Sequence, residues 1–371
     1  MPAHQLQPIV IWFGRVGDMI LLSALLDILH SRYGGRCHVI GAGRWPAQIY
    51  AAHSAVARVS CLHRYTAFLF DIAWWRTVWT LRGARDQPVY VCEYDPPKLL
   101  RVRRLLRASG IDPARCLFLT DTPAGRDTGA HWVDRLVSFA RLTPPAFAAA
   151  DYPWTGPAPA ATAAPRLEVS AAARADCNAW LEAHGFAGRP LVLVQPGNRR
   201  TMRGRRLQLT QGDDKAWPPE RWAALLQQMH AQLPQALLLL CGAPRERLLL
   251  RWIARAARLR CVVPAELPLP RLLALCTCSH SMVSVDTGPA HAAAALSLPL
   301  VVLFGAHAQA EWLPRTPTGS AVVGLGGPPH SSRLDAIAAE TVFAAWCSLP
   351  ARDSPPAPAT LTATAATATP R

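Results

Sequence analysis

Short apolar runs alternate with helical patterns over the first third of the chain. Residues 8–13 are rich in β-branched and aromatic side chains, which predicts a buried strand. Leucines then recur three and four residues apart, which predicts a helix over residues 19–32. Apolar runs at 37–40 and 88–93 predict two further strands. Strands alternating with helices are typical of a parallel sheet with helical crossovers, so we predict a doubly wound α/β unit.

The same alternation restarts after residues 143–165, which are rich in proline and alanine and predict a linker or crossing segment. Apolar runs predict strands at 191–194, 236–241, 281–285 and 299–304, with helices at 219–229, 246–258, 289–297 and 334–347. We therefore predict an α/β protein of two Rossmann-like domains, residues 1–160 and 161–350, facing a central cleft. The Ala, Thr and Pro composition of residues 351–371 predicts a disordered tail.

Composition narrows the class of protein. The 371 residues are 51% hydrophobic and 17% charged, as in folded globular proteins. The apolar runs are too short to span a bilayer, and the first residues lack the basic n-region of a secretory signal, so we expect a cytoplasmic protein. Ten scattered cysteines show no disulfide framework, and Cys276 and Cys278 lack the spacing of a zinc knuckle. We expect neither a metal nor a cofactor.

The charge is strongly positive. With 39 basic and 24 acidic residues, the net charge is +15, and nearly all of the basic residues are arginine, Lys98 and Lys215 being the two lysines. Such a chain is expected to bind anions. Nucleic acid, phosphorylated small molecules and the anionic cytoplasmic leaflet of a membrane all remain open at this point.

Ligands of doubly wound sheets bind where strands end and helices begin, and the first such loop runs from Gly14 to Asp18. Its glycines permit a tight turn and close approach of a ligand to the main chain. Two interpretations of Asp18 are open. It is a general base that takes a proton from an acceptor hydroxyl, or it caps the following helix.

Two further loops carry candidate chemistry. Asp286-Thr287-Gly288 and His291 follow a predicted strand and open a helix, an arrangement suited either to phosphate or to an ordinary capped turn. Lys215 precedes the helix at 219 and is either a diphosphate ligand or a solvated lysine. The same loop holds a basic patch that is open to an acceptor phosphate, a membrane or solvent alone: Arg199, Arg200, Arg203, Arg205 and Arg206.

Three segments together resemble the glycosyltransferase family 9 heptosyltransferases. They are GRVGD with its leucine-rich helix, PG followed by DDKAWPPERWAAL, and VDTGPAHAAAALSLPLVVLFG with Trp312 and Pro314. The resemblance covers roughly residues 8–348. It implies the GT-B fold and an inverting transfer of heptose, or a related sugar, from an ADP-sugar donor to a lipopolysaccharide core acceptor. The nucleotide sugar is then a substrate and not a cofactor.

The resemblance also assigns roles to residues. Asp18 matches the family's catalytic aspartate, and Lys215 matches the lysine that meets the donor diphosphate. Thr287, Gly288 and His291 match the loop around the same phosphates, and Glu246 matches the acidic ribose contact. Arg15, Gly17 and Asp286 are expected to support these loops or the acceptor.

The expected partners are a nucleotide-sugar donor, a phosphorylated lipid or oligosaccharide acceptor, and the anionic inner membrane as a peripheral contact, without nucleic acid. Two other functions stay open. One is a nucleotide-sugar epimerase or isomerase on the same fold, which would need no acceptor. The other is a basic nucleic-acid-binding protein, although the chain shows no recognition-helix, RRM or finger signature.

Overall fold

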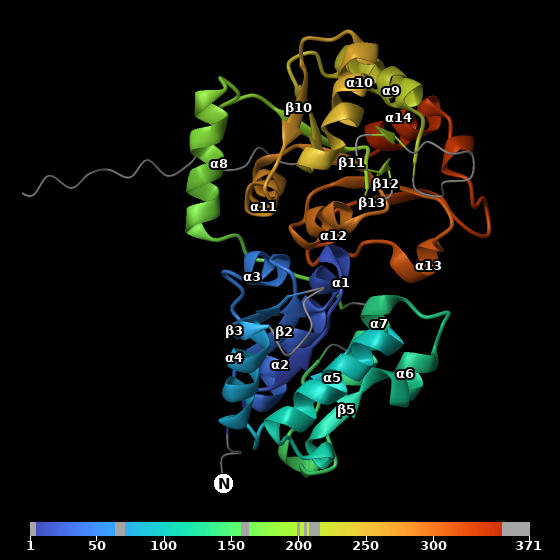
Figure 1. Cartoon of the computed structure of the whole chain (residues 1–371). Coiled ribbons are helices and arrows are strands. Elements are labelled where there is room, and N and C mark those ends of the chain that lie inside the picture. The colour runs from blue at the N-terminus through green and yellow to red at the C-terminus, as the bar shows by residue number, and fades with distance from the viewer. Residues whose placement is uncertain are drawn as a thin grey trace, which may run out of the picture.

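The computed structural model describes residues 5–63, 71–156, 163–198, 201–203, 206–207 and 216–350. Two parallel sheets lie one above the other, each covered by helices (Figure 1). This arrangement confirms the predicted fold class of two Rossmann-like units. The predicted boundary at residue 160 lies outside the described residues, as do the predicted tail and the loop around Lys215, so those predictions stay predictions.

The first sheet has five parallel strands in the order β3-β2-β1-β4-β5. Its order reverses direction between β1 and β4, which is where ligands of such sheets bind. The elements of this half are β1 (Ile9–Ile11), α1 (Val16–Leu21), α2 (Ser23–Tyr33), β2 (Cys37–Ala42), α3 (Trp45–Ile49), β3 (Val56–Leu62), α4 (Ile72–Arg82), β4 (Val89–Val91), α5 (Pro96–Ser109), β5 (Cys116–Phe118), α6 (Pro123–Arg126) and α7 (Trp132–Ala140).

The second sheet has six parallel strands in the order β10-β9-β6-β11-β12-β13, and its order reverses between β6 and β11. Residues Met202–Arg203 (β7) and Arg206–Leu207 (β8) form a separate short ladder. The other elements are α8 (Ala171–Ala183), β6 (Leu191–Gln195), α9 (Pro219–Gln232), β9 (Leu237–Gly242), α10 (Arg247–Ala257), β10 (Val262–Glu266), α11 (Leu269–Cys278), β11 (Ser281–Val285), α12 (Gly288–Ala295), β12 (Leu300–Phe304), α13 (Gln309–Trp312), β13 (Val322–Gly326) and α14 (Ala339–Cys347).

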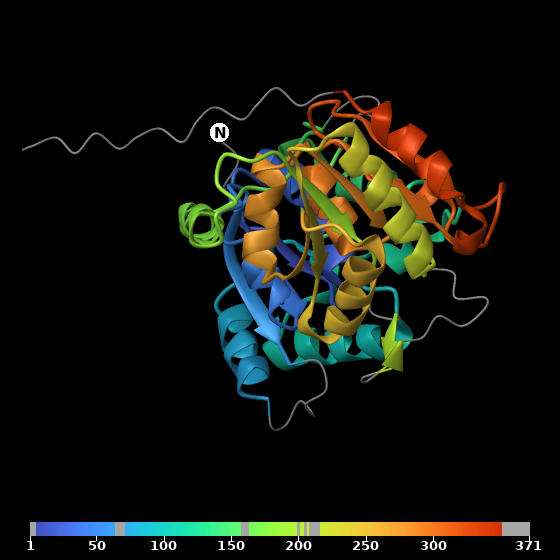
Figure 2. The ribbon, with the colours of Figure 1, turned by 90° about the horizontal axis from the view of Figure 1, so that it is seen from above.

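Three hydrophobic cores hold these layers. α4 and α5 pack on one face of the first sheet, and α9, α10 and α14 pack on one face of the second. The third core joins α1, α2 and α7 from the first half to α11 and α12 from the second, so it is continuous across both halves. Figure 2 shows the two halves superposed when seen from above.

Two predicted helices are interrupted, and side chains explain both breaks. The helix predicted over 19–32 divides at Leu22, because the Ser23 hydroxyl donates to the Ile20 carbonyl (2.7 Å) and competes with the helical ladder. The helix predicted over 334–347 becomes a short 3₁₀ turn followed by α14. At Ile337 the backbone is extended, and its carbonyl accepts hydrogen bonds from Trp217 (2.9 Å) and Arg221.

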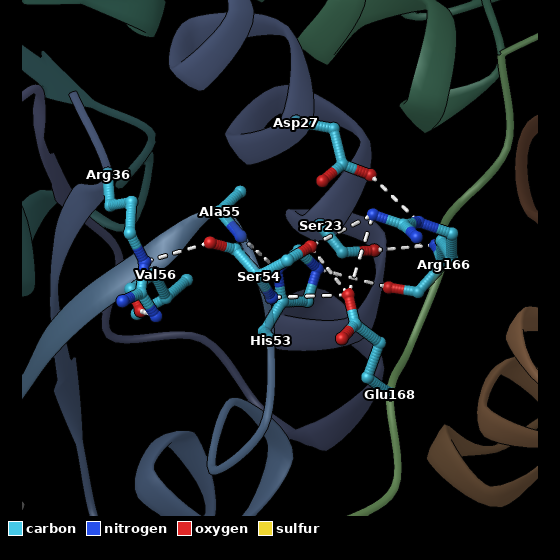
Figure 3. Close-up of polar contacts among 9 residues, drawn as sticks. All are labelled: Ser23, Asp27, Arg36, His53, Ser54, Ala55, Val56, Arg166 and Glu168. Carbon is cyan, nitrogen blue, oxygen red and sulfur yellow. Dashed lines mark hydrogen bonds and ion pairs between the residues drawn. The ribbon is translucent and has the colours of Figure 1, made fainter. Parts of the chain in front are cut away.

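The crossing segment from 163 to 170 is bound to both halves, and Figure 3 shows its contacts with the first half. Arg166 donates its backbone N–H to Ser23 (3.0 Å) and its guanidinium lies 3.5 Å from Asp27. Glu168 accepts hydrogen bonds from the backbone and hydroxyl of Ser54 (3.1 and 2.6 Å). Between these residues, Leu167 donates to Ala295 at the end of α12 (3.3 Å). The segment therefore ties α2 of the first half to α12 of the second.

A second tie crosses between α7 and the chain after α13. Arg315 makes a two-point ion pair with Asp134 (2.6 and 2.7 Å). His131 accepts the Val133 N–H at Nδ1 (3.1 Å), so its Nε2 carries the proton and donates it to the Leu313 carbonyl (2.8 Å). Burial and the nearby Arg315 lower the pKa of His131 to about 4. The neutral imidazole is therefore the form that joins the halves.

We predict that acid destabilises the protein through its buried histidines. Burial also lowers the pKa of His38 to about 4, with Arg58 contributing. Because both folded pKa values lie below the unfolded value of about 6.5, their stabilisation is complete above that pH and is lost as the pH falls towards 4. Each histidine contributes on the order of 3 kcal/mol at neutral pH.

Urea unfolding between pH 7 and pH 4 measures this dependence. His131→Asn keeps an acceptor at the first residue before α7 but does not titrate, so its unfolding free energy should fall less steeply over this range. An unchanged slope in His131→Asn would show that other groups cause the acid sensitivity.

Candidate functional site

The N-terminal ends of α1 and α12 meet between the two sheets (Figure 1). A Cβ placed on Gly17 would lie 3.4 Å from the His291 ring and 3.6 Å from the Gly288 Cα. A Cβ placed on Gly288 would lie 2.9 Å from the Val16 Cβ and 3.0 Å from the Gly17 nitrogen. Two glycines thus allow the backbones to approach, which brings together two of the three loops proposed from the sequence.

Asp18 lies half-buried in the first turn of α1, at the third helical position. Its Oδ2 accepts the Arg15 backbone N–H at 2.6 Å, so it caps the helix from this position and not from the residue before the helix. Gly14 is required for this geometry, because a Cβ there would lie 2.5 Å from the Asp18 Cβ and 2.9 Å from Oδ2. This capping contact involves the carboxylate oxygen Oδ2.

Two residues after β4 also belong to this site, although sequence reasoning did not single them out. Glu93 is buried and accepts the N–H groups of Phe13 (3.0 Å), Tyr94 (3.1 Å) and Asp95 (3.0 Å). It therefore fixes the end of β1, immediately before Gly14, to the end of β4. Partial burial and the carboxylates of Asp18 and Glu93 raise the pKa of Tyr94 to about 12, so its hydroxyl stays protonated.

An aromatic series runs from the end of β1 across to the second half. Trp12 stacks on Trp132 (ring centroids 5.9 Å apart), and Trp132 contacts Trp312 (5.4 Å). Trp312 in turn stacks on His307 (5.6 Å), and Tyr94 lies beside Trp132 (5.2 Å). These contacts place apolar surface next to the loop that carries Asp18. They arise from four separate segments, so no local signal marked the series as a whole, although Trp312 was named with the third motif.

The loop after β11 is organised by side-chain contacts. Asp286 is buried, and its Oδ2 accepts a hydrogen bond from His307 Nδ1 (2.7 Å). Thr287 precedes α12, but its hydroxyl donates to the Val285 carbonyl (3.2 Å) and does not cap the helix. The N-terminus of α12 therefore has no side-chain cap from Thr287, and a helix N-terminus favours negative charge. His291, buried one turn later, packs beneath Gly17.

Glu246 follows β9 and lies 4% exposed. Its Oε2 accepts the Ala243 N–H (2.7 Å), while among the described residues Oε1 has no hydrogen-bond partner. Burial raises the pKa of this carboxyl group. Gly197, just after β6, leaves the space beside Oε1, since a Cβ there would collide with that oxygen. A buried acceptor of this kind needs a donor, which water or a ligand can supply.

Lys215 itself lies outside the described residues, but the motif around it is anchored. Trp217 is buried, contacts Trp222 edge to face (4.7 Å) and donates to Ile337. Pro218 and Pro219 begin α9 as the sequence predicted. Among the described residues, no group of three or more His, Cys, Asp or Glu side chains is placed to hold a metal ion, and no helix is long and apolar enough to cross a bilayer.

The family model for glycosyltransferase family 9 (heptosyltransferase) matches residues 117–333. The match covers more than half of the chain, which therefore belongs to this family and is a glycosyltransferase. A search of curated proteins gives no match.

Solved structures of heptosyltransferases share the fold. A family 9 glycosyltransferase from Veillonella parvula has a TM-score of 0.68 at 15% identity, over 93% of this chain and 97% of that one. The ADP-heptose LPS heptosyltransferase II of E. coli has a TM-score of 0.68 at 18% identity, over 92% and 98%. E. coli heptosyltransferase WaaC with ADP has a TM-score of 0.56 at 18% identity, over 91% and 98%. The predicted GT-B architecture is confirmed.

We predict that Gly288→Ala disrupts the junction between the two helices. The added methyl group would press on Val16 and on the Gly17 backbone, so the free energy of unfolding should fall by about 1–3 kcal/mol, against alanine's ordinary advantage in a helix. Urea unfolding measures the change.

Gly129→Ala is the matched control, because a Cβ there meets no atom within 4 Å. Its unfolding free energy should change little. If Gly288→Ala is as stable as the control, the two helix ends do not depend on this close approach.

Proposed function

We propose that this glycosyltransferase transfers heptose, or a related sugar, from an ADP-sugar donor to a lipopolysaccharide core acceptor with inversion at the anomeric carbon. Family membership supports the sugar and the acceptor class. The likeness to a heptosyltransferase bound to ADP supports the donor. The single observation that carries the donor site is the row of three adjacent strand ends in the second sheet.

That row has the dimensions of a nucleoside diphosphate. Glu246 follows β9, Gly197 follows β6 and Gly288 follows β11, and these three strands are neighbours. With strands ~4.8 Å apart, the outer two ends lie about 10 Å apart. The buried acceptor Oε1 of Glu246 suits a ribose hydroxyl, as acidic residues after the second strand do in Rossmann units. The N-terminus of α12 suits the diphosphate.

In this mechanism Asp18 is the general base. Its carboxylate removes the proton from the acceptor hydroxyl, and the acceptor oxygen attacks the anomeric carbon on the face opposite the diphosphate. The new C–O bond forms as the bond between the anomeric carbon and the phosphate oxygen breaks, and that electron pair leaves with ADP. A single displacement of this kind inverts the anomeric centre.

The departing diphosphate requires electrostatic stabilisation. Lys215 provides a compact positive charge, and the backbone at Thr287 and Gly288 provides the N-terminal dipole of α12. His291 packs behind Gly17 and holds the donor and acceptor loops in register. Asp286 acts through His307 and positions the loop without touching the nucleotide.

We predict selective binding of ADP over UDP, GDP and NAD in titration calorimetry. Lys215→Ala should weaken ADP binding about tenfold or more, because a charge-assisted contact contributes ~1.5–3 kcal/mol. Glu246→Gln should weaken ADP, UDP and GDP by similar factors, because the ribose is common to all three.

Lys98→Ala is the matched control. It removes the other lysine, which lies 3.3 Å from Asp95 and 3.9 Å from Glu93 in the first half, outside the proposed donor loops, and should leave ADP affinity unchanged. Preference for another nucleotide would exclude the ADP-heptose donor but not the transferase. Turnover of a nucleotide sugar without acceptor would support the epimerase alternative.

We predict that Asp18→Asn abolishes transfer while ADP still binds. The amide keeps the side-chain size and an oxygen acceptor for the Arg15 N–H, but it cannot take a proton. The rate of sugar transfer should fall by about 10²–10⁴-fold at a similar ADP dissociation constant. Substantial transfer by Asp18→Asn would show that Asp18 is a helix cap and that another group is the base.

A further inference from the structure

The outer face of α4 is apolar and basic. Ile72, Trp75 and Trp79 are 68%, 40% and 68% exposed, and Arg76 and Arg82 are exposed beside them. These five positions follow the three- and four-residue spacing of a single helix face. The opposite face packs on the sheet through Trp74, Val78 and Leu81. Packing within the fold therefore does not account for the exposure of these two indole rings to solvent.

α5 packs beside α4. Leu100 is 51% exposed, and Arg103, Arg104 and Arg107 are exposed at the helical spacing that follows it. The Arg82 guanidinium joins the two helices by donating to the Ala108 carbonyl (3.2 Å) and lies over the Trp79 ring (5.1 Å). We call the outward residues of these two helices the α4–α5 face.

The α4–α5 face carries one sign of charge. The two helices contain seven basic residues and no acidic one. Lys98, Arg101 and Arg103 have carboxylate partners at Asp95, Asp71 and Asp121. Among the described residues, Arg76, Arg82 and Arg107 take part in no ion pair. Apolar side chains flanked by arginines whose charge is not neutralised complement a surface that is apolar inside and anionic at its boundary.

We propose that the α4–α5 face docks on a bilayer that contains anionic phospholipid. Trp79, Ile72 and Leu100 enter the interface between headgroups and acyl chains, where indole rings are favoured. The arginines contact lipid phosphates while their aliphatic stems cover apolar surface. A nucleic acid would account for the arginines but not for exposed isoleucine and leucine.

The sheet topology places the proposed membrane contact near the candidate site. α4 and α5 each begin at the carboxyl ends of the strands before them, β3 and β4, which is the edge of the sheet that bears Asp18. α5 starts two residues after Tyr94, which lies beside Trp132 near the base. A bilayer against the α4–α5 face would therefore place a lipid-anchored hydroxyl compound on the side of the first half where the loop that carries Asp18 lies. The proposal does not depend on which sugar is transferred.

Flotation of the full chain with vesicles tests the proposal. Phosphatidylcholine vesicles with phosphatidylglycerol should bind the protein, salt should weaken the binding, and phosphatidylcholine alone should bind little. Arg76→Gln with Arg107→Gln should lower the partition coefficient about fivefold for each arginine. Trp79→Ser should lower it several-fold on the same vesicles.

α10 supplies the matched control, because it also exposes a leucine and a tryptophan, Leu248 and Trp252, among arginines. Trp252→Ser, and separately Arg251→Gln with Arg255→Gln, make the same chemical changes on the second half. If these variants weaken vesicle binding as much as the α4–α5 variants do, the attraction is general and the proposed face is wrong.

Two other results would overturn the proposal. One is the absence of binding to anionic vesicles by the unmodified protein. The other is a dimer in light scattering that Trp79→Ser converts to a monomer, which would assign the face to a second copy of the chain. ADP calorimetry on the unmodified protein and on every variant separates the two proposals. If the unmodified protein binds no ADP, the donor assignment fails and the vesicle result still stands.

Discussion

The contact between the Gly17 and Gly288 backbones is the constraint on which the site depends. A Cβ at Gly288 would push α1 and α12 apart, whereas one at Gly17 would meet the His291 ring at an ordinary contact distance, and Asp18 lies on the first of these helices. The two ties elsewhere, Arg315 with Asp134 and Arg166 with Asp27, hold the halves so that this approach persists. The packing of a few atoms thus brings the proposed base to the proposed phosphate site.

Three carboxyl groups near the strand ends differ in their surroundings, and this separates their functions. Glu93 and Glu246 are buried, and burial raises the pKa of both. Glu93 receives three backbone N–H groups and so acts on the shape of the loop, whereas Glu246 has an oxygen with no hydrogen-bond partner in the described part of the chain. Asp18 is half-buried on α1, which contacts α12. Among these three carboxyl groups, it is the one that we propose meets the acceptor.

Local pattern predicted the strands well, because a buried parallel strand is a continuous apolar run that neighbouring residues define. The strand predicted at 281–285 matches β11 at both ends. The break at Leu22 depends on one serine hydroxyl, and the extended backbone at Ile337 depends on Trp217, more than a hundred residues away. Such contacts are visible only after folding.

The residues of the candidate site likewise divide into those that local sequence motifs predicted and those that only the folded structure reveals. Asp18, Gly288 and His291 were singled out because short motifs carry them. Trp312 was named with the third motif, whereas Trp132 was missed because it joins the aromatic series from a distant segment. Glu93 could have been noticed as an acidic residue at the end of an apolar strand. Nothing local distinguishes its hydrogen bonds to the neighbouring loop from ordinary capping.

The net charge of +15 overstates the positive charge that is available to bind a partner, because several arginines bond to the protein's own backbone. Arg32 donates to the carbonyls of Ala140 and Tyr152, and Arg135 donates to those of Ala124 and Gly125. The planar guanidinium fork reaches several carbonyls at once, which the lysine ammonium cannot do with the same fixed geometry. Composition therefore indicates an anionic partner only after such residues are set aside. On α4 and α5, Arg76 and Arg107 lie exposed beside exposed apolar side chains, and it is this pairing that distinguishes a membrane surface from other anions.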